Sequence, residues 1–392
     1  MQPSATLGMT AAAKNLKAAG HSVIGLSAGE PDFDTPAPVA EAGIGAIRNG
    51  QTRYTNNPGM PELRKAIARK LLVENGLEYD PEQIICSNGA KQSVALAISV
   101  LCQDGDEVLI PAPYWVSYPE MVRFAGGIPV FIPASVDSNY LLAAKDLAAA
   151  ITAKTRILIL CSPSNPTGSV YSQSQLEELA AVLRKHPDVF VISDEIYEHI
   201  VYDAKHCSIA SFEGMKDQTI TVNGFSKAYA MTGWRLGYFA ARKDIVRAAD
   251  MLQGQMTSAP STIAQVAGVA ALGLDHAVIQ SMVDQFRKRR DMVVHSLRQI
   301  PDVKCPLPEG AFYVFPDVGA YIGGKTTSGR SINNSTDLCM YILEEHGVAL
   351  VPGEAFGEDR GMRISYAASD EDLVEACKRI HAAFSGILRV RK

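Results

Sequence analysis

Short runs of aliphatic residues alternate with amphipathic helical patterns through the middle of the chain. The aliphatic runs have the length of buried strands, and turns rich in glycine, proline or asparagine separate them from segments with helical periodicity. The predicted strands cover residues 84–86, 107–110, 130–132, 156–161, 189–193, 220–223 and 236–241. The predicted helices between them cover residues 61–75, 90–101, 118–124, 147–151 and 173–185. This order predicts an α/β fold with a mostly parallel sheet covered by helices.

The pattern changes towards the end of the chain. Residues 260–299 have a long helical pattern, and a smaller α+β arrangement follows Pro301. Its predicted elements are a strand at 311–315, a helix at 336–346, a strand pair at 348–351 and 362–366, and a final helix at 371–388. We expect the N-terminal segment to pack with this unit. The prediction is a large domain over residues 45–298 and a small domain built from residues 1–44 and 299–392.

Composition narrows the class of protein. The chain has 392 residues, of which 47% are hydrophobic and 20% charged, as in soluble globular proteins of two or three domains. With 37 basic and 42 acidic residues the net charge is −5, which favours neither nucleic acid nor anionic membrane as a partner. Polar residues interrupt the uncharged stretch 251–274, so we expect no membrane span there. Seven cysteines without a CxxC pair predict reduced thiols, and eight scattered histidines predict no metal site.

Polar residues at strand ends are the first candidates for a site, because ligands of open α/β sheets bind beyond the carboxyl ends of the strands. Residues 88–91 (Asn-Gly-Ala-Lys) begin a helix, whose free N–H groups either hold a phosphate or are simply capped. Residues 162–168 (Ser-Pro-Ser-Asn-Pro-Thr-Gly) follow another strand and also fit a plain turn. Asp194 ends a third strand, where its carboxylate either serves a site or caps the next helix.

Lys227 is a further candidate because small and apolar residues surround it in Asn-Gly-Phe-Ser-Lys-Ala, residues 223–228. It is either a surface lysine whose stem packs on apolar groups or a desolvated amine of lowered pKa. An amine of the second kind is suited to covalent catalysis on a carbonyl group.

Several motifs occur together in one order and at one set of spacings: Asn165-Pro-Thr-Gly, Asp194-x-x-Tyr197, Ser226-Lys227 and Arg235. With them the chain resembles the class I aminotransferases, which have the aspartate aminotransferase fold and use pyridoxal 5'-phosphate (PLP). The resemblance runs from Ala-Gly-Glu-Pro-Asp-Phe at 28–33 to Arg-Ile-Ser-Tyr at 363–366. It implies a large domain with a mostly parallel sheet, a smaller α+β domain, and a homodimer with shared active sites.

The resemblance also implies roles for the catalytic residues. Lys227 matches the lysine that binds PLP covalently and later moves the substrate proton. Asp194 matches the carboxylate that pairs with the pyridinium nitrogen and keeps it protonated. Asn165 and Tyr197 match the residues that hydrogen-bond the phenolic oxygen of the cofactor.

Further positions match the cofactor-binding residues of the family. Those that match the phosphate-binding residues are Gly89, Ala90, Ser226 and Arg235. Tyr54 matches the tyrosine that reaches the phosphate in the neighbouring subunit. Trp115 matches the residue that stacks on the cofactor ring, although a tryptophan beside Pro113 also fits core packing.

The substrate positions follow from the same resemblance. Arg363 matches the arginine that binds the substrate α-carboxylate, and Gly29 matches the glycine whose backbone approaches it; Trp115 and Asn165 contact the substrate as well. Within the class, the chain is most similar to the aspartate aminotransferases shared by bacteria and plastids, some of which convert prephenate to arogenate. There Lys91 matches a lysine that meets the distal carboxylate of the substrate.

Several alternatives stay open at this point. Lys91 could instead supplement phosphate binding. Thr6 matches a threonine that helps admit prephenate, but it could equally cap the first helix. Another amino-acid-specific PLP aminotransferase or lyase on the same fold is the alternative function. Residues 319–326 match a P-loop pattern, although the polar loop that follows does not favour an NTPase.

The family usually carries additional residues before Pro-Ser-Ala-Thr at 3–6, so we expect a processed or truncated chain. This implies a soluble protein of the plastid stroma if the source is a plant or alga, with a transit peptide removed. In any other source we expect a cytoplasmic protein.

Overall fold

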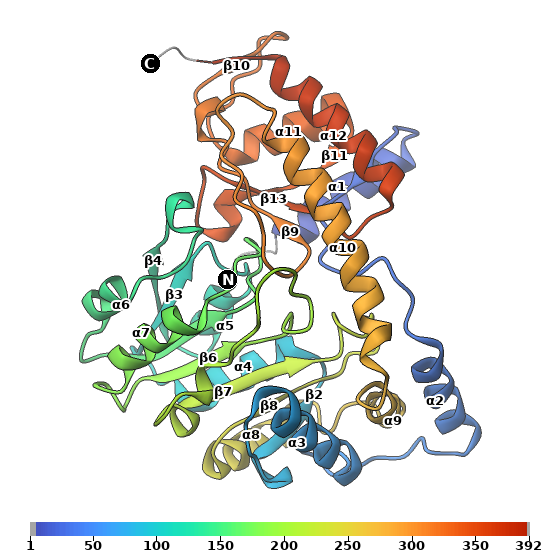
Figure 1. The fold of residues 1–392 in the computed structure, drawn as a ribbon, viewed down its shortest axis with the longest axis vertical. Coiled ribbons are helices and arrows are strands. Elements are labelled where there is room, and N and C mark those ends of the chain that lie inside the picture. The colour runs from blue at the N-terminus through green and yellow to red at the C-terminus, as the bar shows by residue number, and fades with distance from the viewer. Residues whose placement is uncertain (1–4, 390–392) are drawn as a thin grey trace.

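The structure is a computed structural model that describes residues 5–389, so the shortened N-terminus expected around residues 1–4 lies outside the described part. A seven-stranded sheet lies in the lower part of the molecule in Figure 1, in the order β2-β8-β7-β6-β5-β3-β4. Its strands are β2 (Ile84–Ser87), β3 (Glu107–Ala112), β4 (Ile128–Pro133), β5 (Thr155–Cys161), β6 (Phe190–Asp194), β7 (Thr219–Gly224) and β8 (Gly237–Ala240). Six strands run in one direction, and β8 runs in the opposite direction between β2 and β7. Each predicted strand is confirmed to within two residues of its expected bounds.

Helices cover both faces of this sheet, as the alternation along β5 shows. Ile157 and Ile159 belong to one buried layer, and Leu158 and Leu160 belong to the other. The helices over the first layer are α4 (Ala90–Leu101), α5 (Tyr118–Phe124) and α8 (Lys243–Met256). Those over the second are α6 (Ala144–Ala150) and α7 (Gln173–Leu183). Burial on both faces explains why the sequence shows continuous aliphatic runs at these strands.

The helical region predicted over 260–299 consists of two helices, α9 (Thr262–Ala271) and α10 (His276–Leu297). The chain breaks between them because the side chain of Asp275 accepts a hydrogen bond from the Ala277 N–H and caps a new helix. The two helices meet at 88°. Within the described residues, no single helix is long and apolar enough to cross a membrane, and α9 and α10 meet the length and composition criteria only as a bent pair.

The upper part of Figure 1 holds the elements from both ends of the chain. A short antiparallel sheet has the order β12 (Val351–Pro352), β13 (Met362–Ser365) and β9 (Tyr313–Val314). β1 (Ile24–Gly25) pairs in parallel with β11 (Val348–Ala349), so the N-terminal segment packs with the C-terminal unit. The surrounding helices are α1 (Ala5–Ala18), α11 (Ser335–His346) and α12 (Asp370–Ser385). The expected boundary at residues 44–45 falls within α2 (Ala37–Arg48), which packs on α9, and the domain division stays a prediction.

Three details of this unit differ from the expectation. The strand predicted at 348–351 is divided between β11 and β12, which pair with different partners. The last helix ends at Ser385, and β14 (Ile387–Leu388) pairs with β10 (Lys325–Thr326). Lys325 and Thr326 therefore lie in a strand, where a P-loop would begin its helix, which removes the structural basis of an NTPase site.

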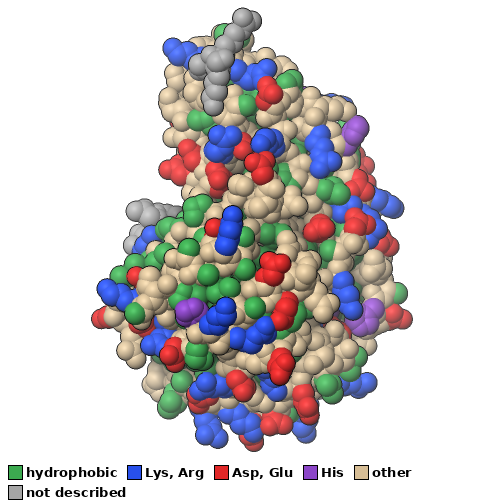
Figure 2. Space-filling model, turned by 60° about the vertical axis from the view of Figure 1, so that its left-hand side comes forward, with side chains coloured by type: hydrophobic (Ala, Val, Ile, Leu, Met, Phe, Trp, Pro, Cys, Tyr) green, Lys and Arg blue, Asp and Glu red, His purple; other side chains and the backbone are tan. Residues whose placement is uncertain are grey.

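Charged side chains are dispersed over the surface. On the face shown in Figure 2, basic and acidic side chains are interspersed over both the upper and the lower part. Lys243, for example, lies 3.0 Å from Asp80 and 3.2 Å from Glu82. Exposed pairs of this kind contribute little to stability. The net charge of −5 is thus not gathered into one patch on this face.

Candidate active site

The carboxyl ends of β2, β3, β5, β6 and β7 meet at one edge of the large sheet, because these strands run in the same direction. A cavity of about 400 Å³ lies beyond this edge and reaches β13 and α1. The predicted site residues that line it are Thr6, Gly29, Ala90, Lys91, Trp115, Asn165, Asp194, Tyr197, Ser226, Lys227, Arg235 and Arg363. Segments far apart in sequence are thus brought to one place.

Asp194 is the buried acid of this cavity. It ends β6 and is only 4% exposed. A turn and not a helix follows it, and its Oδ1 accepts from the Ile196 N–H of this turn at 3.4 Å. The hydroxyl of Tyr118 donates to its Oδ2 at 2.7 Å. Burial raises the pKa of Asp194 to about 6, and the hydrogen bonds from Tyr118 and from the Ile196 N–H offset only part of this rise. A cationic group in the cavity would therefore be stabilised by this carboxylate.

Lys227 follows β7 and points into the same cavity. Its Nζ donates to the carbonyl oxygen of Gly29. Burial, with a contribution from Arg363, lowers the pKa of Lys227 to about 8. The structure therefore supports the desolvated amine and excludes the exposed surface lysine.

Arg363 is the largest fully buried side chain of the described residues, at 2% exposure. Its Nη1 donates to Asn165 Oδ1 at 2.9 Å and its Nη2 to the carbonyl of Ser27 at 2.6 Å, while its Nε has no hydrogen-bond partner. Its guanidinium lies 4.6 Å from the ring centre of Tyr313. No carboxylate in residues 5–389 forms an ion pair with Arg363. A buried cation without a counter-charge is costly, and a ligand carboxylate would remove this cost.

Tyr197 and Asn165 lie between Lys227 and Arg363. The hydroxyl of Tyr197 is 2.8 Å from that of Tyr313. Asn165 accepts from Arg363 through its carbonyl oxygen, so its amide N–H groups remain available as donors. The two side chains thus offer hydrogen-bonding groups to a ligand in the cavity, and their role towards the phenolic oxygen of PLP stays a prediction.

An anion cradle lies at the start of α4. Gly89 precedes the helix with a φ of 88°, and a Cβ there would overlap the guanidinium of Arg235. Gly89 does not itself line the cavity, but it allows Arg235 to lie next to the first turn of α4, where Nη2 donates to the carbonyl of Asn88 at 3.2 Å. The free N–H groups of a helix start, a guanidinium and the nearby Ser226 are suited to a phosphate.

Lys91, Trp115 and Thr6 line the remaining wall. The ammonium of Lys91 lies 4.9 Å from the ring centre of Trp115, and no carboxylate of the described residues pairs with it. Burial lowers the pKa of Lys91, and Arg235 adds to this effect. Thr6 lies inside α1, which is not a helix-cap position.

Like Gly89, Tyr54 is a predicted site residue that does not line the cavity. It is 98% exposed. This placement agrees with a role in a neighbouring subunit, which stays a prediction.

Sequence reasoning missed two tyrosines of the site, Tyr118 and Tyr313. Tyr118 bonds Asp194 and packs edge-on against Trp115, with ring centres 5.2 Å apart. Tyr313 bonds Tyr197 and lies under Arg363. Their sequence signal was weak, because an aromatic residue in a strand or at a helix start usually indicates core packing. The available clue was that a buried tyrosine hydroxyl usually has a hydrogen-bond partner, which here is a residue of the site.

Replacing Tyr118 by phenylalanine should weaken PLP binding by roughly 10- to 100-fold, because a hydrogen bond to a charged group contributes about 1.5–3 kcal/mol. The measurement is a titration of the apoenzyme with PLP followed by visible absorption. Tyr140→Phe is the matched control, since the Tyr140 hydroxyl is buried without a hydrogen-bond partner. Equal PLP affinity in both variants and the wild type would remove the role given to Tyr118.

A model of the family described as aminotransferase class I and II matches residues 21–380. The chain belongs to this family. It is 56% identical over 387 residues to a bifunctional aspartate aminotransferase and glutamate/aspartate-prephenate aminotransferase of Petunia hybrida, covering 98% of this chain and 81% of the relative. It is 50% identical over 382 residues to a probable aspartate/prephenate aminotransferase of Rhizobium leguminosarum bv. phaseoli, covering 97% and 96%.

Solved structures of aspartate aminotransferases have the same fold. The crystal structure of the Rhizobium meliloti enzyme matches with a TM-score of 0.96 at 45% identity, covering 99% of this chain and 98% of the other. The Thermus thermophilus enzyme with maleate matches with a TM-score of 0.92 at 39% identity, covering 98% and 97%. The predicted aspartate aminotransferase fold is confirmed.

Class I and II aminotransferases generally depend on PLP, and the cavity fits this cofactor. The cradle of Ala90, Ser226 and Arg235 suits its phosphate, and the buried carboxylate of Asp194 suits its ring nitrogen. The amine of Lys227, with its lowered pKa, suits its aldehyde. These three features lie in one cavity.

Proposed function

We propose that this protein is a PLP-dependent aminotransferase of dicarboxylic amino acids, converting aspartate and 2-oxoglutarate to oxaloacetate and glutamate. The observation that carries the proposal is that four basic side chains line the cavity and form no ion pair with a carboxylate within residues 5–389: Lys91, Lys227, Arg235 and Arg363. Arg235 is suited to the cofactor phosphate and Lys227 to its aldehyde, which leaves Arg363 and Lys91 for the substrate. Two such cations favour a ligand with two carboxylates. The Thermus thermophilus relative with maleate, itself a dicarboxylate, supports this choice.

Different residues of the chain have different roles in the proposed transamination. Bound PLP supplies a conjugated ring that takes up the electron pair left when the α-proton of the substrate departs. Lys227 accepts this proton at Nζ, and its lowered pKa leaves a useful fraction of the amine neutral near pH 8. Asp194 keeps the ring nitrogen protonated, and Arg363 orients the substrate through its α-carboxylate. The burial of Asp194 and Arg363 excludes water from the charges they hold.

We also propose that prephenate is accepted as an amino acceptor and that the enzyme is a homodimer. The names of the Petunia hybrida and Rhizobium leguminosarum relatives support prephenate. Thr6 supports it as well, since it lines the cavity and matches the threonine that helps admit prephenate. The exposure of Tyr54 supports a shared site, in which this hydroxyl reaches the phosphate of the neighbouring subunit.

The proposal is tested in two half-reactions with purified enzyme loaded with PLP. Aspartate should convert the visible absorption of bound PLP to that of the pyridoxamine form, and 2-oxoglutarate or prephenate should restore it. Steady-state comparison of prephenate, oxaloacetate and 2-oxoglutarate then ranks the acceptors. Release of ammonia or pyruvate from aspartate would instead identify a lyase and contradict the aminotransferase.

Replacing Lys91 by alanine should raise the KM for aspartate and prephenate by roughly 10- to 100-fold, because one charge-assisted contact to the distal carboxylate is lost. The KM for alanine, which has no distal carboxylate, should stay unchanged and serves as the control substrate. The PLP dissociation constant is measured alongside. Weaker PLP binding with an unchanged KM for aspartate would place Lys91 with the phosphate instead.

A further inference from the structure

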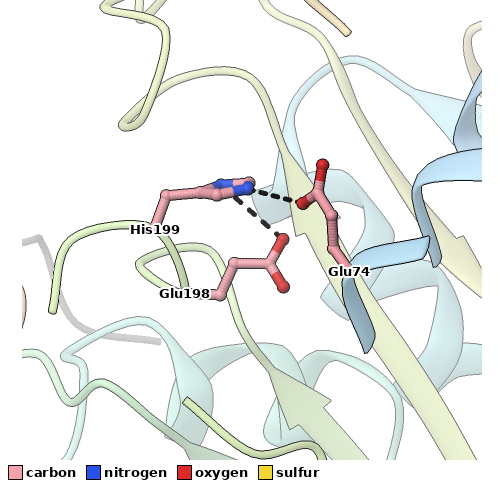
Figure 3. A group of neighbouring side chains, drawn as sticks. All are labelled: Glu74, Glu198 and His199. Atoms are coloured by element: carbon pink, nitrogen blue, oxygen red, sulfur yellow. Dashed lines mark hydrogen bonds and ion pairs between the residues drawn. The ribbon is translucent and has the colours of Figure 1, made fainter. Parts of the chain in front are cut away.

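A buried cluster of charged side chains lies behind the turn that follows Asp194 and carries Tyr197. Its centre is Glu198, which is not among the residues lining the cavity. Glu198 Oε1 pairs with Lys70 Nζ of α3 (Pro61–Asn75), and both side chains are 4% exposed. Figure 3 shows His199 beside the carboxylates of Glu74 and Glu198, with its Nε2 2.8 Å from Glu74 and its Nδ1 3.7 Å from Glu198.

The charge of the cluster is balanced from within the chain. The ligand atoms of Glu74, Glu198 and His199 are close enough together to hold a metal ion. However, the ammonium of Lys70 already contacts Glu198 and lies 3.5 Å from Glu74. The positive charge that balances the carboxylates of Glu74 and Glu198 is therefore supplied by Lys70, without a metal ion. Since a buried ion pair adds little stability over apolar packing, the cluster calls for another explanation.

Two asparagine amides complete the shell of Glu198, and they come from different elements. Asn223 of β7 donates to Oε1 at 2.6 Å, and Asn75 at the end of α3 donates to Oε2 at 2.7 Å. Asn223 is the fourth residue before Lys227, and its Oδ1 accepts from the Gly224 N–H at 2.7 Å. β6 and β7 are paired as far as Asp194 and Val222, and the Glu195 N–H donates to the Val222 carbonyl at 2.9 Å. The bond from Asn223 extends this connection beyond the strand pair, to the turn after Asp194.

Glu198 is also rigidly placed within its own turn. Its N–H donates to the carbonyl of Glu195 at 2.9 Å, and the preceding residue is Tyr197. Burial alone would raise the pKa of Glu198, but Lys70, His199 and His206 hold it well below its usual range, so the carboxylate stays charged. A permanently charged acceptor between two catalytic segments is suited to fixing their distance.

We propose that Glu198 is a positioning residue that, through Asn223, fixes the turn that follows Asp194 and bears Tyr197 relative to the segment bearing Lys227. The inference rests on the proposed function, because the groups it positions are those that would act on PLP. Asn75 offers a built-in comparison. It donates to the same carboxylate, but from α3, outside both catalytic segments.

The experiment compares Asn223→Ala with Asn75→Ala as PLP-loaded enzymes. Each variant loses one amide donor to Glu198 and one further hydrogen bond, which runs from the Gly224 N–H to Asn223 Oδ1 or, at 2.8 Å, from Lys70 Nζ to Asn75 Oδ1. Both variants keep the Lys70–Glu198 ion pair, so both should fold. Asn223→Ala should lower kcat for aspartate by roughly 10- to 100-fold with little change in KM, because small misplacements of catalytic groups are costly. It should also shift the pH midpoint of the visible absorption of bound PLP. Asn75→Ala should change neither quantity while lowering Tm by a similar amount.

Each outcome of this comparison either supports or contradicts the positioning role of Glu198. If both variants lower Tm and leave kcat and the absorption midpoint unchanged, the cluster only stabilises the fold and the proposal is wrong. If both change kcat equally, the bond from Asn223 has no special role. Asn223→Gln, which displaces the amide by one methylene, replaces the alanine variant if that one does not fold. A wild-type protein without PLP absorption would contradict the proposed function itself, so the two failures are distinguishable.

Discussion

Replacement of Lys227 by alanine should abolish transamination, with a fall in kcat of at least about 10⁴-fold. The variant loses both the amine that holds PLP and the base that accepts the substrate proton. PLP should then be removable by dialysis, and the visible absorption of the wild-type enzyme should be absent. The measurements are steady-state turnover of aspartate and an absorption spectrum after dialysis.

Lys325→Ala is the control for this experiment, because Lys325 is exposed and lies in the segment that resembles a P-loop. It should leave turnover and absorption unchanged. The wild type adds a pH test. Burial lowers the pKa of Lys227 to about 8, so the neutral amine becomes more abundant as pH rises towards that value. The rate at which apoenzyme takes up PLP should rise with pH, reach half of its maximum near pH 8 and level off about one pH unit above the pKa. Normal turnover by Lys227→Ala would refute the assignment.

Replacement of Arg363 by methionine should lower kcat/KM for aspartate by roughly 30-fold to several thousandfold, since losing one partner of a buried charge pair costs about 2–5 kcal/mol. The affinity for PLP should change little. Arg363→Lys should restore only part of the loss, because a lysine cannot form the two parallel bonds that a guanidinium makes to a carboxylate.

Thermal unfolding of the apoenzyme distinguishes this role from a structural one. Arg363 has no ion-pair partner in the described residues, so Arg363→Met should keep or raise Tm. Arg289 is the matched control, because it is also largely buried but pairs with Asp32 and Asp370, each at 2.8 Å. Arg289→Met should lower Tm. A larger loss of Tm for Arg363→Met than for Arg289→Met would contradict a substrate-binding role.

The sequence predicted the large sheet well because its strands are buried on both faces and are therefore continuous in apolar residues. It did not predict α8. There Gln253 occupies a buried position and donates to the carbonyls of Asn57 and Cys86, so a polar residue interrupts the apolar face. It also did not predict the break between α9 and α10, because both helices continue the same apolar periodicity.

The candidate site was predicted where short motifs follow strands, since parallel strands bring their ends together without further information. What could not be predicted are the contacts between distant segments. Lys70 and Glu198 are separated by 128 positions, and Tyr118 and Asp194 by 76. Neither member of these pairs has a local pattern that reveals its partner. Tyr54 shows the same limit, because its expected partner belongs to another subunit.

The unpaired guanidinium of Arg363 has a practical consequence for how the enzyme is handled. Within the described residues, the basic side chains that line the cavity form no ion pair with a carboxylate, so the cavity attracts small dianions. Sulfate, phosphate, citrate and similar buffer components should therefore occupy the cavity and compete with aspartate. Affinities measured in such buffers would be underestimates, whereas zwitterionic buffers with chloride as the only added anion would give values closer to the intrinsic ones.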